Sequence, residues 1–161
     1  MSKITIAHTY AQSPSTVFAA LNDFAGIYRF HPLLESSPLV DGTPETGAGS
    51  ERVCHLHDGN TLHERLTGAE LDSWLTVEIV DTSMPMASGG GRYDLAPTRT
   101  GGTELTMTMD FTLKMGLLGR VLDTLVVGRK LRANLELVLA SLEQHLESGE
   151  DVPRAWASSA A

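Results

Sequence analysis

Two adjacent stretches decide the fold: TELTMTMDFTLK at residues 103–114 and GLLGRVLDTLVVGRKLRANLELVLASLEQHLE at residues 116–147. In the first stretch, apolar residues from Leu105 to Leu113 alternate with polar ones, and this period of two predicts a strand with one buried face. In the second, leucines and valines recur at helical spacing and predict a helix of about 30 residues, ~45 Å long. Because one such helix cannot bury its apolar stripe alone, we expect it to lie across a sheet.

The segment upstream of these stretches predicts a strand, two short helices and several further strands. Residues 3–10 alternate as a strand does. Ser13 and Pro14 predict a helix start, because serine caps a helix and proline at the first helical position loses no useful hydrogen bond. A second short helix is expected over residues 24–30, and Pro32 should end it.

Between residues 33 and 113 the pattern is one of strands separated by turns. Turn sequences such as Asp58-Gly59 divide this region into about six strand candidates, and their spacing favours antiparallel hairpins. The three glycines at 89–91 precede a strand and are expected at the rim of the sheet. The domain is predicted to span residues 1–148, followed by a disordered tail over residues 149–161.

Composition excludes several classes of function. A length of 161 residues suits one domain. The net charge of −8 disfavours binding to nucleic acid and to anionic membranes. The chain starts without a signal-peptide pattern and has no apolar run of roughly 18 residues, so we expect no stable membrane insertion. The single cysteine, Cys54, fits a reducing compartment, and a cytoplasmic protein is expected. The oligomeric state stays open.

The hairpin around Asp58-Gly59 carries charged residues in an otherwise apolar pattern. A two-residue loop would place Arg52 opposite Arg65, pairing like charges. A three-residue loop over residues 58–60 puts Gly59 where a left-handed residue is needed and gathers the leucines on one face. This second register is preferred, and it places Arg52 and Glu64 on the concave face as diagonal neighbours. A slip of one residue would separate them.

The order of these elements resembles the helix-grip fold of the START and Bet v 1 (SRPBCC) superfamily, and within it the bacterial polyketide cyclase/dehydrase and lipid-transport group. The resemblance covers residues 3–147. Four local features carry it: the helix opening Ser13-Pro14 with Val17-Phe18, the exit Phe30-His31-Pro32, the segment from Gly49 and Arg52 through Asp58-Gly59 to Glu64-Arg65-Leu66, and the terminal helix. It implies an α+β fold in which a curved antiparallel sheet of about seven strands, two short helices and a long C-terminal helix enclose an apolar cavity.

Several residues on the expected concave face are candidates for a site. Glu64 could act as an acid or base with Arg52 as an anchor, the two could contact a polar ligand group, or they could form a structural ion pair that closes the cavity. Tyr93 either offers its hydroxyl to a ligand or is a core aromatic residue whose hydroxyl is already hydrogen-bonded. The candidate catalytic residues are thus Glu64 and Tyr93. The expected ligand-binding residues are Arg52, Glu64, Leu66, Val77, Tyr93, Met107, Met109, Phe111, Leu122 and Leu125.

Other conspicuous residues are given structural interpretations. His55, His57 and His63 alternate onto the convex face, so we expect a solvated surface and no metal site or cofactor. His31, expected at the helix exit near the cavity entrance, is interpreted first as a turn histidine with satisfied hydrogen bonds, and the alternative is a gate or proton donor. Gly128 interrupts the helical stripe and either leaves space for a ligand or permits close packing.

Three functions remain open. The leading hypothesis is a carrier or sensor that holds a small hydrophobic or amphipathic ligand, such as a lipid, a polyketide-like ring system or an isoprenoid. The second is a metal-free polyketide cyclase or dehydratase that uses Glu64 for proton transfer. The third is a co-chaperone-like interaction module with a filled core.

Overall fold

The structure, a computed structural model, describes residues 2–114 and 122–155, and the side chains of residues 122–127 lie outside that description. Its elements follow the predicted order of strand, short helices, strands and long helix. They are β1 (Ser2–Tyr10), α1 (Pro14–Asn22), the 3-10 helix η1 (Ala25–Arg29), β2 (Leu34–Ser36), β3 (Glu51–Leu56), β4 (Thr61–Glu70), β5 (Trp74–Thr82), β6 (Met86–Pro97), β7 (Thr103–Leu113) and α2 (Leu122–Ser148).

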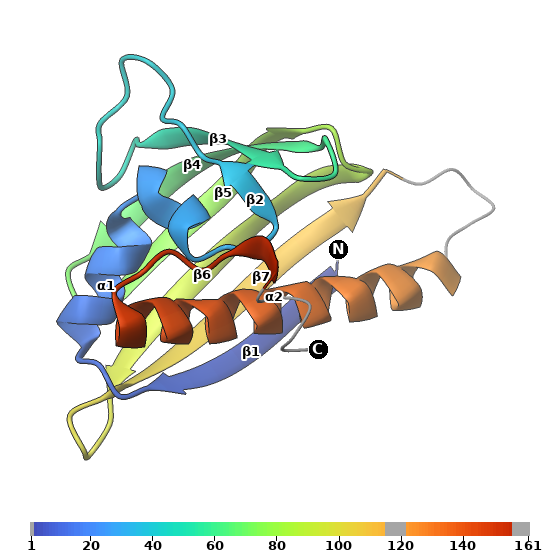
Figure 1. The fold of residues 1–161 in the computed structure, drawn as a ribbon. Coiled ribbons are helices and arrows are strands. Elements are labelled where there is room, and N and C mark those ends of the chain that lie inside the picture. Colours follow the sequence, from blue (N-terminus) through green and yellow to red (C-terminus); the bar gives the residue numbers. More distant parts are fainter. Residues whose placement is uncertain (1, 115–121, 156–161) are drawn as a thin grey trace.

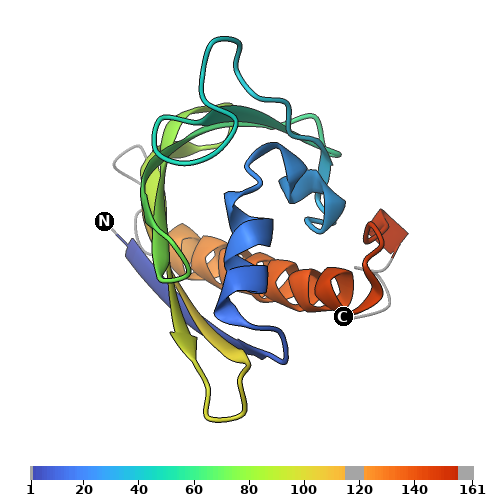
Figure 2. The same cartoon turned by 90° about the vertical axis from the view of Figure 1, so that its left-hand side faces the viewer.

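The strands form one seven-stranded antiparallel sheet in the order β1-β7-β6-β5-β4-β3-β2. The sheet curves strongly, with α1 and η1 lying in its concavity (Figure 2). Helix α2 crosses beneath the sheet along nearly its whole length (Figure 1). The predicted helix-grip architecture is thereby confirmed. Within the described ranges, none of the helices combines the length and apolarity that crossing a bilayer requires.

Helix α1 begins as its sequence predicts. The hydroxyl of Ser13 accepts a hydrogen bond from the backbone N–H of Thr16 at 3.3 Å, and Pro14 occupies the first helical position. Val17 and Phe18 from the same helix are buried against the sheet. The cap therefore fixes where the helix starts, and the apolar pair fixes which face it turns inward.

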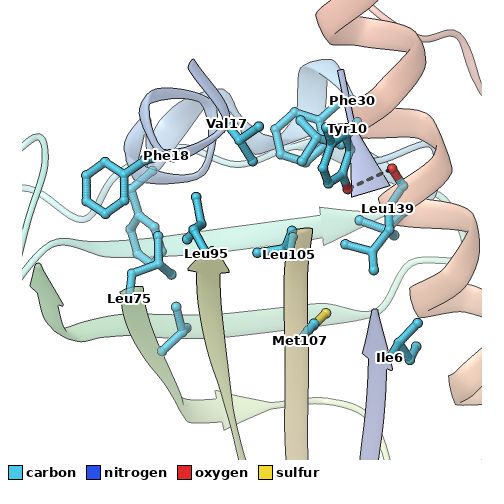
Figure 3. Packing of buried hydrophobic residues seen from close by; sticks show 14 of the residues in the cluster. Ile6, Tyr10, Val17, Phe18, Phe30, Leu75, Leu95, Leu105, Met107 and Leu139 are labelled. Atoms are coloured by element: carbon cyan, nitrogen blue, oxygen red, sulfur yellow. Dashed lines mark hydrogen bonds between the residues drawn. The ribbon is translucent and has the colours of Figure 1, made fainter. Parts of the chain in front are cut away.

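The end of the interior next to α1 is tightly packed. Val17, Leu75 and Leu105 belong to one buried cluster there, with Leu95 between the two leucines in Figure 3, and each of the three is nearly inaccessible to solvent. The hydroxyl of Tyr10 on β1 donates to the backbone carbonyl of Leu139 on α2 at 3.0 Å (Figure 3). This buried hydrogen bond ties the long helix to the edge of the sheet.

The glycines at 89–91 lie inside β6 and not at the rim, so that prediction was wrong. Gly89 pairs with Phe111 of β7. A Cβ atom on Gly89 would approach Cδ1 of Ile79 to 2.7 Å and Sδ of Met86 to 2.9 Å. These two atoms end flexible side chains that can move aside. A Cβ atom on Gly90 would instead approach the backbone carbonyl oxygen of Val77 to 2.9 Å, so the firmer reason for glycine lies at Gly90, and the local sequence does not reveal it.

Residues 150–155, here called the C-terminal strap, turn back from the end of α2 towards η1 (Figure 1). The N–H of Val152 donates to the carbonyl of Arg29 at 2.7 Å, and Nε of Arg29 donates to Asp151 at 2.8 Å. Val152 is only 6% exposed and belongs to the core. The expectation of a disordered tail therefore does not hold for residues 150–152, because one buried valine anchors them.

Candidate ligand-binding site

The β3–β4 hairpin brings Arg52 and Glu64 together. The N–H of Leu56 donates to the carbonyl of Asn60 at 2.9 Å, closing a three-residue loop in which Gly59 has φ +86°. The predicted shared face of Arg52 and Glu64 is correct. The loop lies one residue earlier than expected, so the two residues are directly opposite each other and not diagonal.

The Arg52 guanidinium is buried and fully engaged. Its Nε and Nη2 atoms both donate to Oε2 of Glu64 at 2.7 Å, and Nη1 donates to the carbonyl of Phe24 at 3.0 Å. The guanidinium also lies 3.9 Å from the centre of the Phe24 ring, in cation–π geometry. Burial alone would lower the pKa of Arg52, but the charge and hydrogen bonds of Glu64 outweigh it and raise the pKa. Arg52 therefore stays charged in the interior.

Cys54 stands beside this pair as an inert thiol. Its Sγ lies 3.6 Å from Oε2 of Glu64 and donates to it. Burial raises the pKa of the Cys54 thiol, and the charge of Glu64 raises it further. Since the thiolate is the nucleophilic form, Cys54 acts here as a weak donor and carries no reactivity.

A small inner pocket of about 30 Å³ lies beyond Glu64, with room for about two water molecules. The Glu64 side chain is 15% exposed. Burial raises the pKa of the Tyr93 phenol, and the charge of Glu64 adds to this, so Tyr93 is a neutral donor. The residues lining the inner pocket come from the concave faces of β4 to β7 and are Glu64, Val77, Ile79, Gly90, Gly91, Tyr93, Met107 and Met109.

A larger outer pocket of about 420 Å³ opens at the end of the sheet away from α1. It lies where the β3–β4 turn, the β5–β6 turn and the end of β7 face α2, with one residue of the strap at its edge. Its volume falls within the range of small-molecule sites in proteins. The outer pocket is lined by Leu33, Leu56, His57, Asp58, Asn60, Met84, Pro85, Met86, Leu113, Lys130, Leu131, Asn134 and Arg154.

The predicted site residues are distributed unevenly around these pockets. Five of them line the inner pocket, namely Glu64, Val77, Tyr93, Met107 and Met109. Leu66 and Phe111 are fully buried in the core, and Arg52 lies behind Glu64. The side chains of Leu122 and Leu125 lie outside the described part of the chain. The outer pocket was missed, because turns, strand ends, α2 and the strap bring its lining together from separate parts of the chain, which no local pattern predicts.

His31 differs from its expected role. Its Nδ1 atom is buried and, among the residues that the structure describes, has no hydrogen-bond partner. Burial lowers the pKa of His31 to about 4, and the nearby positive charge of Arg52 contributes to that shift. The imidazole is therefore neutral near pH 7. The residue is not the satisfied turn histidine that the sequence suggested.

The histidines of the hairpin form no metal cluster. His63 donates to Oε2 of Glu51 at 2.7 Å, and Arg65 donates to the other oxygen of Glu51 at the same distance. His55 is exposed, and His57 lies at the rim of the outer pocket. Across residues 2–114 and 122–155, no three histidine, cysteine or acidic side chains are grouped to hold a metal ion.

Gly128 on α2 is not packed closely against any described part of the chain. A Cβ atom added there would meet no atom of the described residues within 4 Å. Arg132, one turn further on, is exposed and donates to the carbonyl of Thr5 on the edge strand β1 at 3.2 Å. The described residues therefore give no close-packing reason for a glycine at this position.

Comparison with known proteins places this arrangement in a family. The solved structures that resemble it include XoxI from Bacillus cereus, with a TM-score of 0.74 and 20% identity over 92% of this chain and 97% of that one. A START superfamily protein from Mycobacterium smegmatis has a TM-score of 0.73 and 13% identity, over 90% of this chain and 97% of that one. Ara h 8.0201 has a TM-score of 0.72 and 15% identity, over 91% of this chain and 98% of that one. At these identities the likeness concerns the fold. A search of curated protein sequences found no match. Residues 1–147 match the family described as polyketide cyclase/dehydrase and lipid transport, and the chain belongs to that family.

Proposed function

We propose that the protein binds a small hydrophobic or amphipathic molecule between its sheet and α2, as a carrier or sensor. The outer pocket, about 420 Å³, supplies an entrance with apolar walls. The inner pocket, which shares no lining residue with the outer pocket, is lined in part by Met107 and Met109. Because methionine side chains are flexible, they can move aside to enlarge the inner pocket for a ligand.

The observation that carries the proposal is the way the inner polar groups are left available. Both hydrogen bonds from the Arg52 guanidinium to Glu64 go to the Oε2 atom. Within the described residues, neither Oε1 of Glu64 nor the hydroxyl of Tyr93 makes a hydrogen bond, and both residues line the inner pocket. One acceptor and one donor thus stand in an apolar setting. A ligand with a single hydroxyl or carbonyl group and an apolar body would satisfy them.

An enzymatic role is the second candidate, and the same carboxylate supports it. A polyketide cyclase or dehydratase must move a proton at a ligand carbonyl or hydroxyl, and Glu64 faces the inner pocket with one oxygen outside the ion pair. Tyr93, kept neutral by its raised pKa, could donate to a carbonyl oxygen. An interaction module with a filled core is less well supported, because the outer pocket is open.

Ligand extraction combined with a Glu64→Gln variant tests these roles. A carrier should purify with an apolar ligand detectable by mass spectrometry, and Glu64→Gln should retain most of the affinity for a fluorescent fatty acid. An enzyme should turn over a poly-β-carbonyl probe, and Glu64→Gln should abolish turnover while binding persists. The matched control is Glu104→Gln, an exposed position on β7. A folded protein that carries no ligand and binds neither probe would refute the proposal.

A further inference from the structure

We propose that the outer pocket takes an amphiphile with an anionic head group, and that Lys130 and Arg154 bind that head at the rim. This inference rests on the proposed function and specifies the class of ligand. None of the residues predicted from the sequence lines the outer pocket. The site is therefore separate from the polar pair Arg52 and Glu64 in the interior.

The charges at the rim favour an anion. Lys130 comes from α2 and Arg154 from the C-terminal strap, and both are exposed at the edge of the outer pocket. Neither takes part in any ion pair formed by the described residues. The one carboxylate in the lining, Asp58, accepts a hydrogen bond from the N–H of Asn60 at 3.0 Å. Two cations against one carboxylate make this rim locally positive in a chain of net charge −8.

The walls of the outer pocket are suited to a hydrocarbon body. Seven of its lining residues are apolar, and they come from the loop before β2, the ends of β3 and β7, the β5–β6 turn and α2. They are Leu33, Leu56, Met84, Pro85, Met86, Leu113 and Leu131. Burial of a hydrocarbon chain against such walls supplies affinity in proportion to the apolar area removed from water. An ion that lacks a tail would forgo this contribution.

The fold positions Arg154 through the strap. The N–H of Val152 donates to the carbonyl of Arg29, and Asp151 pairs with the Arg29 guanidinium at 2.8 Å. Nδ1 of His145 lies 2.6 Å from the carbonyl oxygen of Glu150, to which it donates. These three contacts fix the chain immediately before Arg154. The backbone that leads to Arg154 is therefore placed beside the pocket before a ligand arrives, and only the arginine side chain remains to be ordered on binding.

Calorimetric titration with dodecanoate and dodecanol tests the inference, because the two probes share a tail and differ in head-group charge. The wild type should bind dodecanoate roughly tenfold more tightly than dodecanol, a difference of ~1.4 kcal/mol. Arg154→Gln and Lys130→Gln should each remove several-fold of that preference and leave the affinity for dodecanol unchanged. Arg99→Gln and Lys3→Gln, at exposed positions away from the outer pocket, are the matched controls. Added salt should weaken dodecanoate binding more in the wild type than in Arg154→Gln.

Three results would overturn the head-group assignment. The first is equal affinity for the two probes, and the second is a preference for dodecanoate that survives both substitutions. The third is binding of acetate alone as tightly as dodecanoate, which would mean an anion site without a role for the tail. In the first two cases the proposed function stands, because the tail still binds. If neither dodecanoate nor dodecanol binds, the proposed function fails together with this inference.

Discussion

Arg52 and Glu64 are joined through a single carboxylate oxygen, since Nε and Nη2 of the arginine both donate to Oε2 at 2.7 Å. The arginine is buried at the back of the site, and the glutamate lines the inner pocket. One pair therefore serves two purposes. It neutralises a charge inside the domain, and it leaves the second oxygen of Glu64 available to a ligand.

Removal of one partner of this pair should be costly. Glu64→Ala leaves the Arg52 guanidinium, which is 3% exposed, without a counter-charge, and the free energy of unfolding should fall by ~3–5 kcal/mol. The double variant Arg52→Met/Glu64→Leu removes both charges and should lose much less. Urea denaturation followed by circular dichroism measures both values. If the losses caused by Arg52→Met alone and by Glu64→Leu alone add up to the loss in the double variant, the two side chains are not coupled.

His31 should make stability depend on pH. Its pKa is about 4 in the folded protein against 6.5 ordinarily, so the unfolded chain takes up the proton first as the pH falls. The stabilisation is fully present above pH 6.5 and is lost progressively down to about pH 4, by roughly 3 kcal/mol. His31→Gln should flatten this part of the profile. The same slope in the variant would assign the effect to other groups.

Leu142 should be essential for holding α2 against the sheet. It is completely buried, and Leu142→Ala should lower the free energy of unfolding by ~2–5 kcal/mol through lost burial and the cavity left behind. Glu147→Ala, at an exposed position five residues later on the same helix, should change it by less than about 0.5 kcal/mol. Thermal denaturation of both variants distinguishes packing of the helix from helix propensity. Equal losses of stability in Leu142→Ala and Glu147→Ala would contradict the role of Leu142 in packing α2 against the sheet.

The C-terminal strap should be held more by its valine than by its ion pair. Val152→Ala removes apolar area from the core and should cost ~1–2 kcal/mol. Asp151→Asn weakens a largely exposed pair with Arg29 and should cost less than about 1 kcal/mol. Hydrogen exchange at the Val152 amide, together with urea denaturation, measures both effects. A larger loss from Asp151→Asn would reverse this order.

The sequence predicted those parts of the fold whose stability depends on periodicity. Strand β7 extends over Thr103–Leu113, close to the predicted range, because its alternation places Leu105 and Phe111 in the core. The pattern of the hairpin was enough to place Arg52 and Glu64 on one face. The pattern did not fix the position of the loop. A three-residue loop at 57–59 and one at 58–60 both place Arg52 and Glu64 on the same face of the hairpin, so the alternation of side chains does not distinguish them.

The rest depends on tertiary contacts that no local pattern records. Among the described residues, Nδ1 of His31 is buried without a hydrogen-bond partner, although the backbone N–H and carbonyl of His31 are both paired. The turn sequence His31-Pro32 does not reveal this burial. Helices α1 and η1 lie in the concavity of the sheet (Figure 2). Val152 becomes part of the core only because α2 ends beside Arg29. The outer pocket collects residues from six separate segments. None of these positions would stand out from residue type or spacing alone.

If the space between the sheet and α2 receives an apolar ligand, a substitution that fills the inner pocket should weaken binding. Met109→Trp places a larger side chain at the wall of the inner pocket, while Thr106→Trp makes a similar change on the opposite face of β7. If the tail of a fatty acid extends from the outer pocket into the inner pocket, the affinity for a fluorescent fatty acid, measured by displacement titration, should fall at least tenfold in Met109→Trp and stay unchanged in Thr106→Trp. Wild-type affinity in a folded Met109→Trp protein would contradict the account.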